Sequence, residues 1–298
     1  MLINSVHIEG FWNKYSLNWK LNKDVNLLSG INGSGKTTLL HSIVTVLYSG
    51  TLISTVKNKI RYIDIQLTDG YRICCENHDD DIQTVCTHDN QEISFEEFSL
   101  NLNLEDITTF DSNLPNEEKY KQYVTFKKDR VRSELDLTLD ETLNDYYKYL
   151  AIISREVEYA VKNKKENLDS ILNLYKRKNH FTAKVNELFA PTRKKWDETS
   201  NEVRFLLEDG KAIPPQELSS GEKQLLILLF STLTQNGEEF ITFWDEPEIS
   251  MHIDWQRALI RTVREINPSA QLIIATHSPS IIYEGWEKRV VNMEDLLQ

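Results

Sequence analysis

The chain has 298 residues, of which 40% are hydrophobic and 27% charged, a composition that excludes a largely disordered protein. Its longest apolar run, Leu225 to Phe230, is far shorter than the ~20 residues of a membrane span. The first residues lack the basic start and apolar stretch of a secretory signal, and three cysteines are too few for a disulfide framework. We therefore expect a cytoplasmic protein without membrane association.

The formal net charge of −12 argues against a general nucleic-acid binder, but the charge is unevenly distributed. Residues 76–114 contain 11 acidic and no basic side chains, whereas residues 115–205 contain 19 of the 34 lysines and arginines. We interpret the acidic block as a face available to a basic partner. The basic clusters are candidate nucleic-acid contacts, or simply a solvated helical face, and they lie at 162–165, 176–178 and 193–195.

Hydrophobic patterns predict strands in the first part of the chain and helices in the middle. The strand candidates, including a hairpin that turns at Thr68–Gly70, are residues 2–9, 15–21, 25–29, 60–67 and 71–75. From about 140 to 188, apolar residues recur every three or four positions, which indicates helices. A helix of about 25 residues spans only ~37 Å, so this lobe is a stub rather than a long coiled-coil arm.

The last ninety residues alternate between helical and strand patterns. Helices are predicted at 224–233 and 254–266, and strands at 240–244 and 271–275. This alternation is typical of a parallel sheet covered by helices.

Residues 30–37 fit the phosphate-loop pattern G-x-x-x-x-G-K-[ST], between a predicted strand and a predicted helix. Glycines let backbone N–H groups surround a phosphate at a helix N-terminus. Lys36 is expected to reach the β- and γ-phosphates, and the Thr37 hydroxyl to bind Mg²⁺. The candidate nucleotide contacts are Gly30, Asn32, Gly33, Ser34, Gly35, Lys36, Thr37 and Thr38. A glycine-rich turn that binds nothing is the alternative.

The predicted strand at 240–244 ends in two carboxylates, Asp245 and Glu246. Asp245 is expected to hold Mg²⁺ through its water shell, and Glu246 to act as the general base for an attacking water. Acidic surface residues at the end of a strand are the alternative interpretation.

Two further motifs allow a comparison with a known class. Leu218-Ser-Ser-Gly-Glu-Lys-Gln224 opens a predicted helix, and His277 follows the strand at 271–275. In this order the motifs resemble ABC-type ATPase heads of the SMC, Rad50, RecF and OLD branch. The resemblance implies an α/β P-loop NTPase fold, with a mixed sheet that combines an antiparallel β subdomain and a parallel core, and an inserted short helical lobe.

The same resemblance implies ATP and Mg²⁺ as ligands and a homodimer or higher oligomer whose heads pack head-to-tail around ATP. The signature residues implied to contact nucleotide are Ser219, Ser220, Gly221 and Glu222. Of these, Ser219 and Gly221 would touch the γ-phosphate held by the other head, at the start of a helix. His277 would be the switch histidine, so the implied catalytic residues are Lys36, Glu246 and His277.

The segment Asp245-Glu-Pro-Glu-Ile-Ser-Met-His-Ile-Asp-Trp255 resembles small anti-phage defence ATPases sometimes grouped as AAA15, among them the OLD, Septu and PARIS ATPases. OLD-type nucleases carry a Toprim domain after the ATPase, and the 21 residues after His277 are too few for one. The expected division is an N-terminal ATPase lobe at 1–114, a helical lobe at 115–210 and a C-terminal ATPase lobe at 211–298.

Some features of the sequence lack a clear assignment. The nucleotide-sensing glutamine cannot be placed: Gln66 lies in a predicted strand, Gln83 in the acidic block, and residues 109–111 contain none. Asp79–Asp81 are interpreted as a solvated acidic loop rather than a nuclease triad. A cluster of cysteines and histidines is a candidate zinc site: Cys74, Cys75, His78, Cys86 and His88. A zinc site is the less favoured interpretation, because the adjacent Cys74 and Cys75 point to opposite faces of a strand.

The leading functional hypothesis is an ATP-driven switch that dimerises on ATP and controls a separately encoded effector, such as a nuclease, in anti-phage defence. A RecF-like repair ATPase that binds DNA through its helical lobe is one alternative. A structural scaffold cemented by ATP is another. A transporter subunit fits least, because the insertion between the two ATP motifs is too long.

Overall fold

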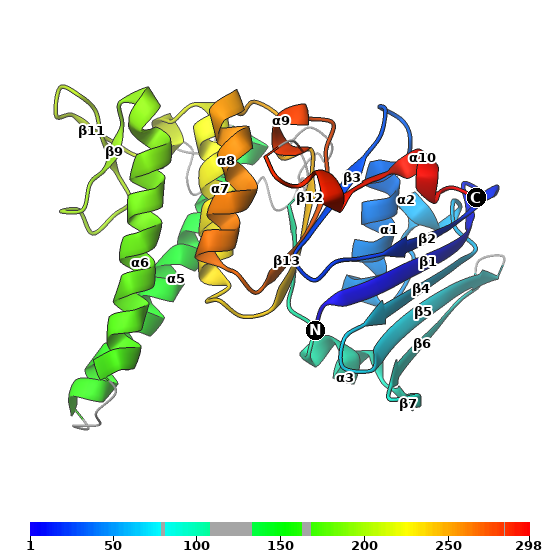
Figure 1. The fold of residues 1–298 in the computed structure, drawn as a ribbon. Helices are drawn as coiled ribbons and strands as arrows, with labels where there is room; N and C mark the ends of the chain where they lie inside the picture. Colours follow the sequence, from blue (N-terminus) through cyan, green and yellow to red (C-terminus); the bar gives the residue numbers. More distant parts are fainter. Residues whose placement is uncertain (79–80, 108–132, 163–167, 283) are drawn as a thin grey trace. The chain divides into compact units, whose positions relative to one another are not determined.

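The computed structural model describes residues 1–78, 81–107, 133–162, 168–282 and 284–298 (Figure 1). The chain forms two compact units, which are considered separately. The first comprises Met1–Thr109, Glu238–Glu248 and Ser269–Gln298, and the second comprises Phe110–Gly237 and Ile249–Pro268.

The first unit contains an antiparallel sheet with the strand order β2-β1-β4-β5-β6-β7. Its strands are β1 (Ile3–Phe11), β2 (Tyr15–Lys20), β4 (Tyr62–Leu67), β5 (Tyr71–His78), β6 (Asp81–His88) and β7 (Gln91–Ile93). β4 and β5 form the predicted hairpin, with Asp69 and Gly70 both at positive φ in its turn. One face of this sheet carries alternating apolar residues that enter the core.

A second, entirely parallel sheet in the same unit has the order β14-β3-β13-β12-β8. Its strands are β3 (Val25–Ser29), β8 (Leu104–Ile107), β12 (Phe240–Asp245), β13 (Ala270–Ala275) and β14 (Val290–Asn292). Every residue of β13 and nearly every residue of β12 is buried, as expected for a sheet covered on both faces.

Helix α1 (Lys36–Ser49) packs against both sheets, and its apolar residues join their facing side chains in one core. Figure 1 shows the helix lying beside the antiparallel sheet. The first unit also contains short helices: α2 (Ser54–Lys57), α3 (Phe95–Leu100), α9 (Pro279–Ile282), α10 (Met293–Leu296) and a 3-10 turn at Glu287–Arg289. Because α1 is the next element after β3, the loop that joins them lies at the carboxyl edge of the parallel sheet.

The second unit is mainly helical. Its helices are α5 (Glu134–Lys162), α6 (Leu168–Phe189), α7 (Ser220–Thr234) and α8 (Ile253–Ile266), with 3-10 turns at Ala190–Thr192 and Pro215–Glu217. α5 packs along α7, and α7 packs on α8. The 29 residues of α5 span ~43 Å, which agrees with the predicted stub rather than a long arm.

A small sheet, β9 (Lys195–Trp196), β10 (Phe205–Leu206) and β11 (Ala212–Ile213), covers one side of these helices with the order β11-β10-β9. Aromatic rings join the helices to this sheet. Tyr146, Phe181 and Phe230 of the three helices pack with centroid separations of 4.7–6.3 Å, and Trp196 of β9 lies 5.9–6.1 Å from each of them. Such pairs stabilise a core beyond the area they bury.

The predicted fold class is confirmed: an antiparallel β subdomain, a parallel core and a short helical lobe are all present. The predicted acidic loop is wrong at Asp81, which begins β6; Asp79 and Asp80 lie outside the described residues. The two compact units do not coincide with the three predicted lobes, because α7 and α8 pack with α5 and α6 in the second unit. No helix in the described ranges is long and apolar enough to cross a membrane.

Candidate active site

The phosphate loop lies between the end of β3 and the start of α1. Gly30, Gly33 and Gly35 all have positive φ, of 152°, 82° and 103°, which side-chain-bearing residues rarely adopt. Their conformation turns the loop so that α1 begins at Lys36, with its N-terminal N–H groups free of side-chain caps. Ile31, Asn32 and Gly33 are exposed at the tip of the loop. The arrangement fits an anion at the helix N-terminus.

Lys36 is buried although it carries a charge. Its Nζ donates to the carbonyl oxygens of Gly30 and Ile31, at 2.9 and 3.4 Å, and lies 3.5 Å from Glu246 Oε1. The ammonium therefore lies inside the loop it belongs to, where phosphate oxygens could exchange with the carbonyl groups as its partners.

Asp245 and Thr37 form a hydroxyl–carboxylate pair beside this lysine. Asp245 is buried at the end of β12; burial raises its pKa, and the hydrogen bond from the Thr37 hydroxyl acts in the opposite direction. Its Oδ1 has no hydrogen-bond partner among the described residues. A buried carboxylate oxygen beside a hydroxyl is a donor set that suits Mg²⁺, so the residues fit the predicted metal.

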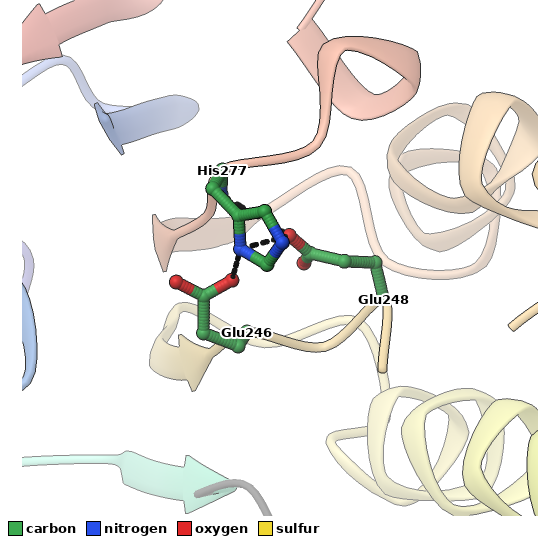
Figure 2. A group of neighbouring side chains, drawn as sticks. All are labelled: Glu246, Glu248 and His277. Atoms are coloured by element: carbon green, nitrogen blue, oxygen red, sulfur yellow. Dashed lines mark hydrogen bonds and ion pairs between the residues drawn. The ribbon is translucent and has the colours of Figure 1, made fainter. Parts of the chain in front are cut away.

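Glu246 and His277 meet next to the same lysine (Figure 2). Glu246 directly follows β12 and has a positive φ of 49°, while its N–H donates to the Ala275 carbonyl at 2.8 Å. This turn directs its carboxylate toward His277, whose Nδ1 is hydrogen-bonded to Glu246 Oε2. Positive φ in a residue other than glycine is strained and is often found at functional sites.

Glu248 is a site residue that the sequence prediction missed. Its side chain is 5% exposed, and its Oε1 lies 3.6 Å from His277 Nδ1. Burial, together with the neighbouring Glu246, raises the pKa of Glu248 to about 7. Glu246, Glu248 and His277 could in principle offer ligands to a cation, but Glu248 Oε1 already accepts hydrogen bonds from three donors on the histidine loop. We therefore interpret the group as an acid–base cluster.

Asp106 is a second acidic residue brought to the site from a distance in the sequence. It lies on β8, which pairs in parallel with β12. Burial and the charge of Asp245 raise the pKa of Asp106 to about 7. The predicted sensing loop at residues 109–111 lies outside the described residues, but the strand that leads toward it ends beside Asp245.

The raised pKa of Asp106 predicts a pH-dependent stability. A folded-state pKa above the unfolded value contributes stability that is present below about pH 4 and is lost as the pH rises through about 7. The Asp106→Asn variant should therefore melt ~2–4 °C above wild type at pH 8, the shift expected for ~1 kcal/mol, and close to wild type at pH 4. Thermal melts of both proteins across this range test the prediction. An equal difference at both pH values would show that packing, rather than charge, is responsible.

The signature residues lie in the second unit, at the start of α7. Ser219 caps the helix, and its N–H and hydroxyl both donate to Glu222 Oε2 in a reciprocal capping box. Burial disfavours ionisation of Glu222, but hydrogen bonds from Lys194, Ser219 and Thr192 outweigh it and lower its pKa. The sequence leaves Lys194 as either a nucleic-acid contact or part of a solvated face, and the structure places its Nζ 2.8 Å from Glu222 Oε1.

The signature needs glycine at position 221, because the backbone of Ser250 lies too close for a side chain. A Cβ at this position would lie 2.2 Å from the Ser250 carbonyl oxygen and 3.4 Å from the Trp255 ring. Trp255 is itself fixed, because its Nε1 donates to the Leu188 carbonyl at 2.7 Å. The start of α7 can therefore pack this closely only with glycine.

Trp12 is another residue that the sequence prediction missed. It follows β1, has a positive φ of 53° and stacks on Phe11 with the ring centroids 5.2 Å apart. A Cβ on Gly35 would lie 3.0 Å from the Trp12 ring, so the indole borders the phosphate loop while staying partly exposed. An aromatic residue 23 positions before Gly35, at a predicted strand end, was the signal available in the sequence.

The remaining sequence candidates do not join this site. Gln66 lies on β4 and Gln83 on β6, both in the antiparallel sheet. The three cysteines are free thiols, and burial raises the pKa of both Cys75 and Cys86 to about 11. Among the basic clusters, Lys162 pairs with Glu158 and Arg193 with Glu208, while residues 164–165 lie outside the described part of the chain.

Comparison with known proteins agrees with this geometry. Residues 81–282 match the family described as an AAA domain, putative AbiEii toxin, type IV TA system, and this match covers more than half of the chain. The chain belongs to this family. The matched segment begins after the phosphate loop and includes the signature, Asp245, Glu246 and His277.

Two proteins with similar sequences have names that indicate a function. Septu protein PtuA of Bacillus thuringiensis is 22% identical over 315 residues, which covers 95% of this chain and 73% of that protein. The retron Vc95 probable ATPase of Vibrio cholerae serotype O1 biovar El Tor is 23% identical over 176 residues, 48% of this chain and 34% of that protein. The resemblance to Septu-type ATPases, predicted from residues 245–255, is thus confirmed.

Solved structures show the same fold. An Smc head domain from Pyrococcus furiosus, bound to the C-terminal domain of ScpA, aligns with a TM-score of 0.55 at 15% identity and covers 98% of this chain and 93% of that chain. The SMC head domain from Thermotoga maritima aligns with a TM-score of 0.53 at 11% identity, covering 95% and 92%. The chain therefore has the fold of an SMC head.

Proposed function

We propose that this chain binds and hydrolyses ATP with Mg²⁺ as one half of a head-to-tail dimer, and that this assembly controls a separately encoded effector in anti-phage defence. The observation that carries the proposal is the convergence of Lys36, Asp245, Glu246 and His277 at the carboxyl edge of the parallel sheet. These residues come from three separate parts of the chain and are linked by direct contacts from Lys36 through Glu246 to His277.

Each residue has a distinct role in this proposal. Lys36 exchanges its loop carbonyl partners for β- and γ-phosphate oxygens, and Thr37 and Asp245 hold Mg²⁺, which would neutralise phosphate charge. Glu246 accepts the proton of the attacking water, and its contact with His277 keeps the carboxylate oriented toward that water. The partly exposed Trp12 ring offers a stacking surface for the base.

The exposure of the site supports a second copy as its cover. Ile31 is 71% exposed at the tip of the phosphate loop, and the His277 side chain is 55% exposed. Active sites for phosphoryl transfer exclude bulk water, so a nucleotide bound here needs a further surface to close over it. The start of α7 in a second copy is the proposed cover: the Ser219 hydroxyl would exchange Glu222 for a phosphate oxygen, beside the backbone of Gly221.

Molar mass in solution tests the proposed assembly. Light scattering after gel filtration should give about the chain mass of 34.8 kDa without nucleotide and about twice that value with ATP and Mg²⁺. The Lys36→Ala variant, which loses the phosphate partner, should stay at the lower mass, and the exposed-lysine control Lys23→Ala should behave as wild type. A mass that does not respond to ATP in wild type would contradict the proposed ATP-driven dimer.

The defence setting is supported by the relatives named Septu and retron and by the toxin–antitoxin description of the family. The two alternative functions have less support. A RecF-like DNA clamp would use the basic residues of the helical lobe, and some of these, Lys162, Lys184 and Lys194, already pair with acidic side chains. A static scaffold would not need the contact between Glu246 and His277.

A further inference from the structure

The buried carboxylate of Glu248 holds the loop that carries His277. Its Oε1 accepts hydrogen bonds from the Thr276 hydroxyl and from the backbone N–H groups of His277 and Ser278, the latter two at 3.2 and 3.1 Å. Three consecutive residues of one loop therefore donate to a single oxygen atom. Because hydrogen bonds are directional, three donors that share one acceptor hold the loop against this carboxyl group.

This contact fixes where the loop backbone can lie. Thr276 is also tied to β3, because its N–H donates to the Leu28 carbonyl at 3.1 Å. Its hydroxyl in turn accepts from the Ser278 N–H at 2.9 Å. Thr276 and Ser278 are buried, while the His277 side chain between them is exposed. The imidazole is thus carried by a loop whose two neighbouring residues are both anchored.

The chain geometry after β12 directs both glutamates to this imidazole. Glu246 is in the left-handed region, and the buried Pro247 follows it with its fixed φ. Figure 2 shows the carboxylates of Glu246 and Glu248 on either side of the His277 ring. Glu246 contacts the ring and also lies near Lys36, whereas Glu248 contacts the ring and the loop backbone.

Packing alone does not explain why a carboxyl group is buried at position 248. Glu222, the comparable buried acid of the second unit, is balanced by Lys194 and has a lowered pKa. Glu248 instead has a raised pKa, which means that folding disfavours its charged form. Buried ionisable groups with this property are often found at functional sites.

We propose that Glu248 is a positioning residue for ATP hydrolysis, which holds the Thr276–Ser278 loop so that the His277 imidazole stays against the Glu246 carboxylate. The inference rests on the proposed ATPase function and assigns a role to the second glutamate of the Asp245–Glu248 segment. Glu248 acts through His277 and does not itself contact the nucleotide. Loss of Glu248 should therefore lower kcat more than it changes KM.

A double-mutant cycle with His277 tests this role. Steady-state ATPase kinetics are measured for wild type, Glu248→Ala, His277→Ala and the double variant. Glu248→Ala is expected to lower kcat by about 10- to 100-fold, with KM and the affinity for a fluorescent ATP analogue changed less than about threefold. In the His277→Ala background the same substitution should lower kcat by less than about threefold, because its effect requires the imidazole.

Two further variants keep the test decisive if Glu248→Ala folds poorly. Glu248→Gln keeps an acceptor oxygen for the loop donors and should retain more activity than Glu248→Ala. Thr276→Val removes one donor without touching Glu248 and should lower kcat by a smaller factor in the same direction. Asp64→Asn, which replaces a buried carboxylate on β4 that pairs with Arg72, is the matched control and should keep wild-type kcat.

The possible outcomes separate this inference from the proposed function. A wild-type protein without ATPase activity would overturn the proposed function itself. Activity that falls by the same factor on removing Glu248, with or without His277, would overturn the positioning role alone, as would equal losses of ATP affinity and kcat. A kcat for Glu248→Ala equal to that of wild type would also overturn it.

Discussion

Replacing Glu246 by glutamine is expected to slow steady-state ATP hydrolysis by about 10²- to 10⁴-fold, the usual contribution of a general base. The amide keeps the shape of the side chain and can still bond His277, but it cannot accept a proton from the attacking water. Binding should persist, since Lys36 keeps its phosphate partners and Asp245 and Thr37 are unchanged. Phosphate release and binding of a fluorescent ATP analogue measure the two quantities separately.

The same variant should accumulate as an ATP-bound dimer, because the step that would release the two chains is slowed. Expressed with the products of its native gene neighbours, this dimer should retain a separately encoded effector. Glu239→Gln, an exposed residue near the start of the same strand β12, is the matched control and should hydrolyse ATP as wild type does. If Glu246→Gln retained wild-type turnover, another residue would have to be the base.

The parts of the site that the sequence predicted are those encoded by short, continuous segments. The phosphate loop needs glycines at fixed offsets before Lys36, and Asp245 and Glu246 follow a strand that is apolar enough to be recognised as buried. Each of these patterns has a local physical cause, so it is visible without the fold. The alternation of helix and strand patterns predicted the parallel core, and the resemblance to ABC-type heads implied the antiparallel sheet.

The roles of Glu248, Asp106 and Trp12 could not be predicted in this way. Glu248 acquires its role from donors 28 to 30 residues later in the chain, and Asp106 from the pairing of β8 with β12. These contacts exist only after the sheet has formed. β6 was missed for a different reason: its residues alternate between exposed and partly buried positions near a sheet edge, so they lack a strong apolar pattern.

Mixing two inactive variants should restore ATPase activity if the active site is shared between chains. Lys36→Ala removes the phosphate partner, and Gly221→Ala places a Cβ 2.2 Å from the Ser250 carbonyl, which must displace the start of α7. Each variant alone should have less than a few per cent of wild-type activity, roughly the loss of a main transition-state contact. A head-to-tail dimer of one chain of each kind contains one intact site, formed by the Lys36 of one chain and the Gly221 of the other.

Each mixed dimer has one of its two sites intact and is held by the ATP bound at that site. The mixture should therefore recover activity on the order of a quarter of wild type, the value for random assortment and independent sites. The matched control mixes Lys36→Ala with the double variant Lys36→Ala, Gly221→Ala, in which no intact site can form. Lys36 and Gly221 belong to different compact units of the chain, and neither substitution can repair the other within one molecule. Recovery in the first mixture and not in the second can therefore come only from sites built by two chains. A first mixture that is no more active than its components would mean that each chain works alone.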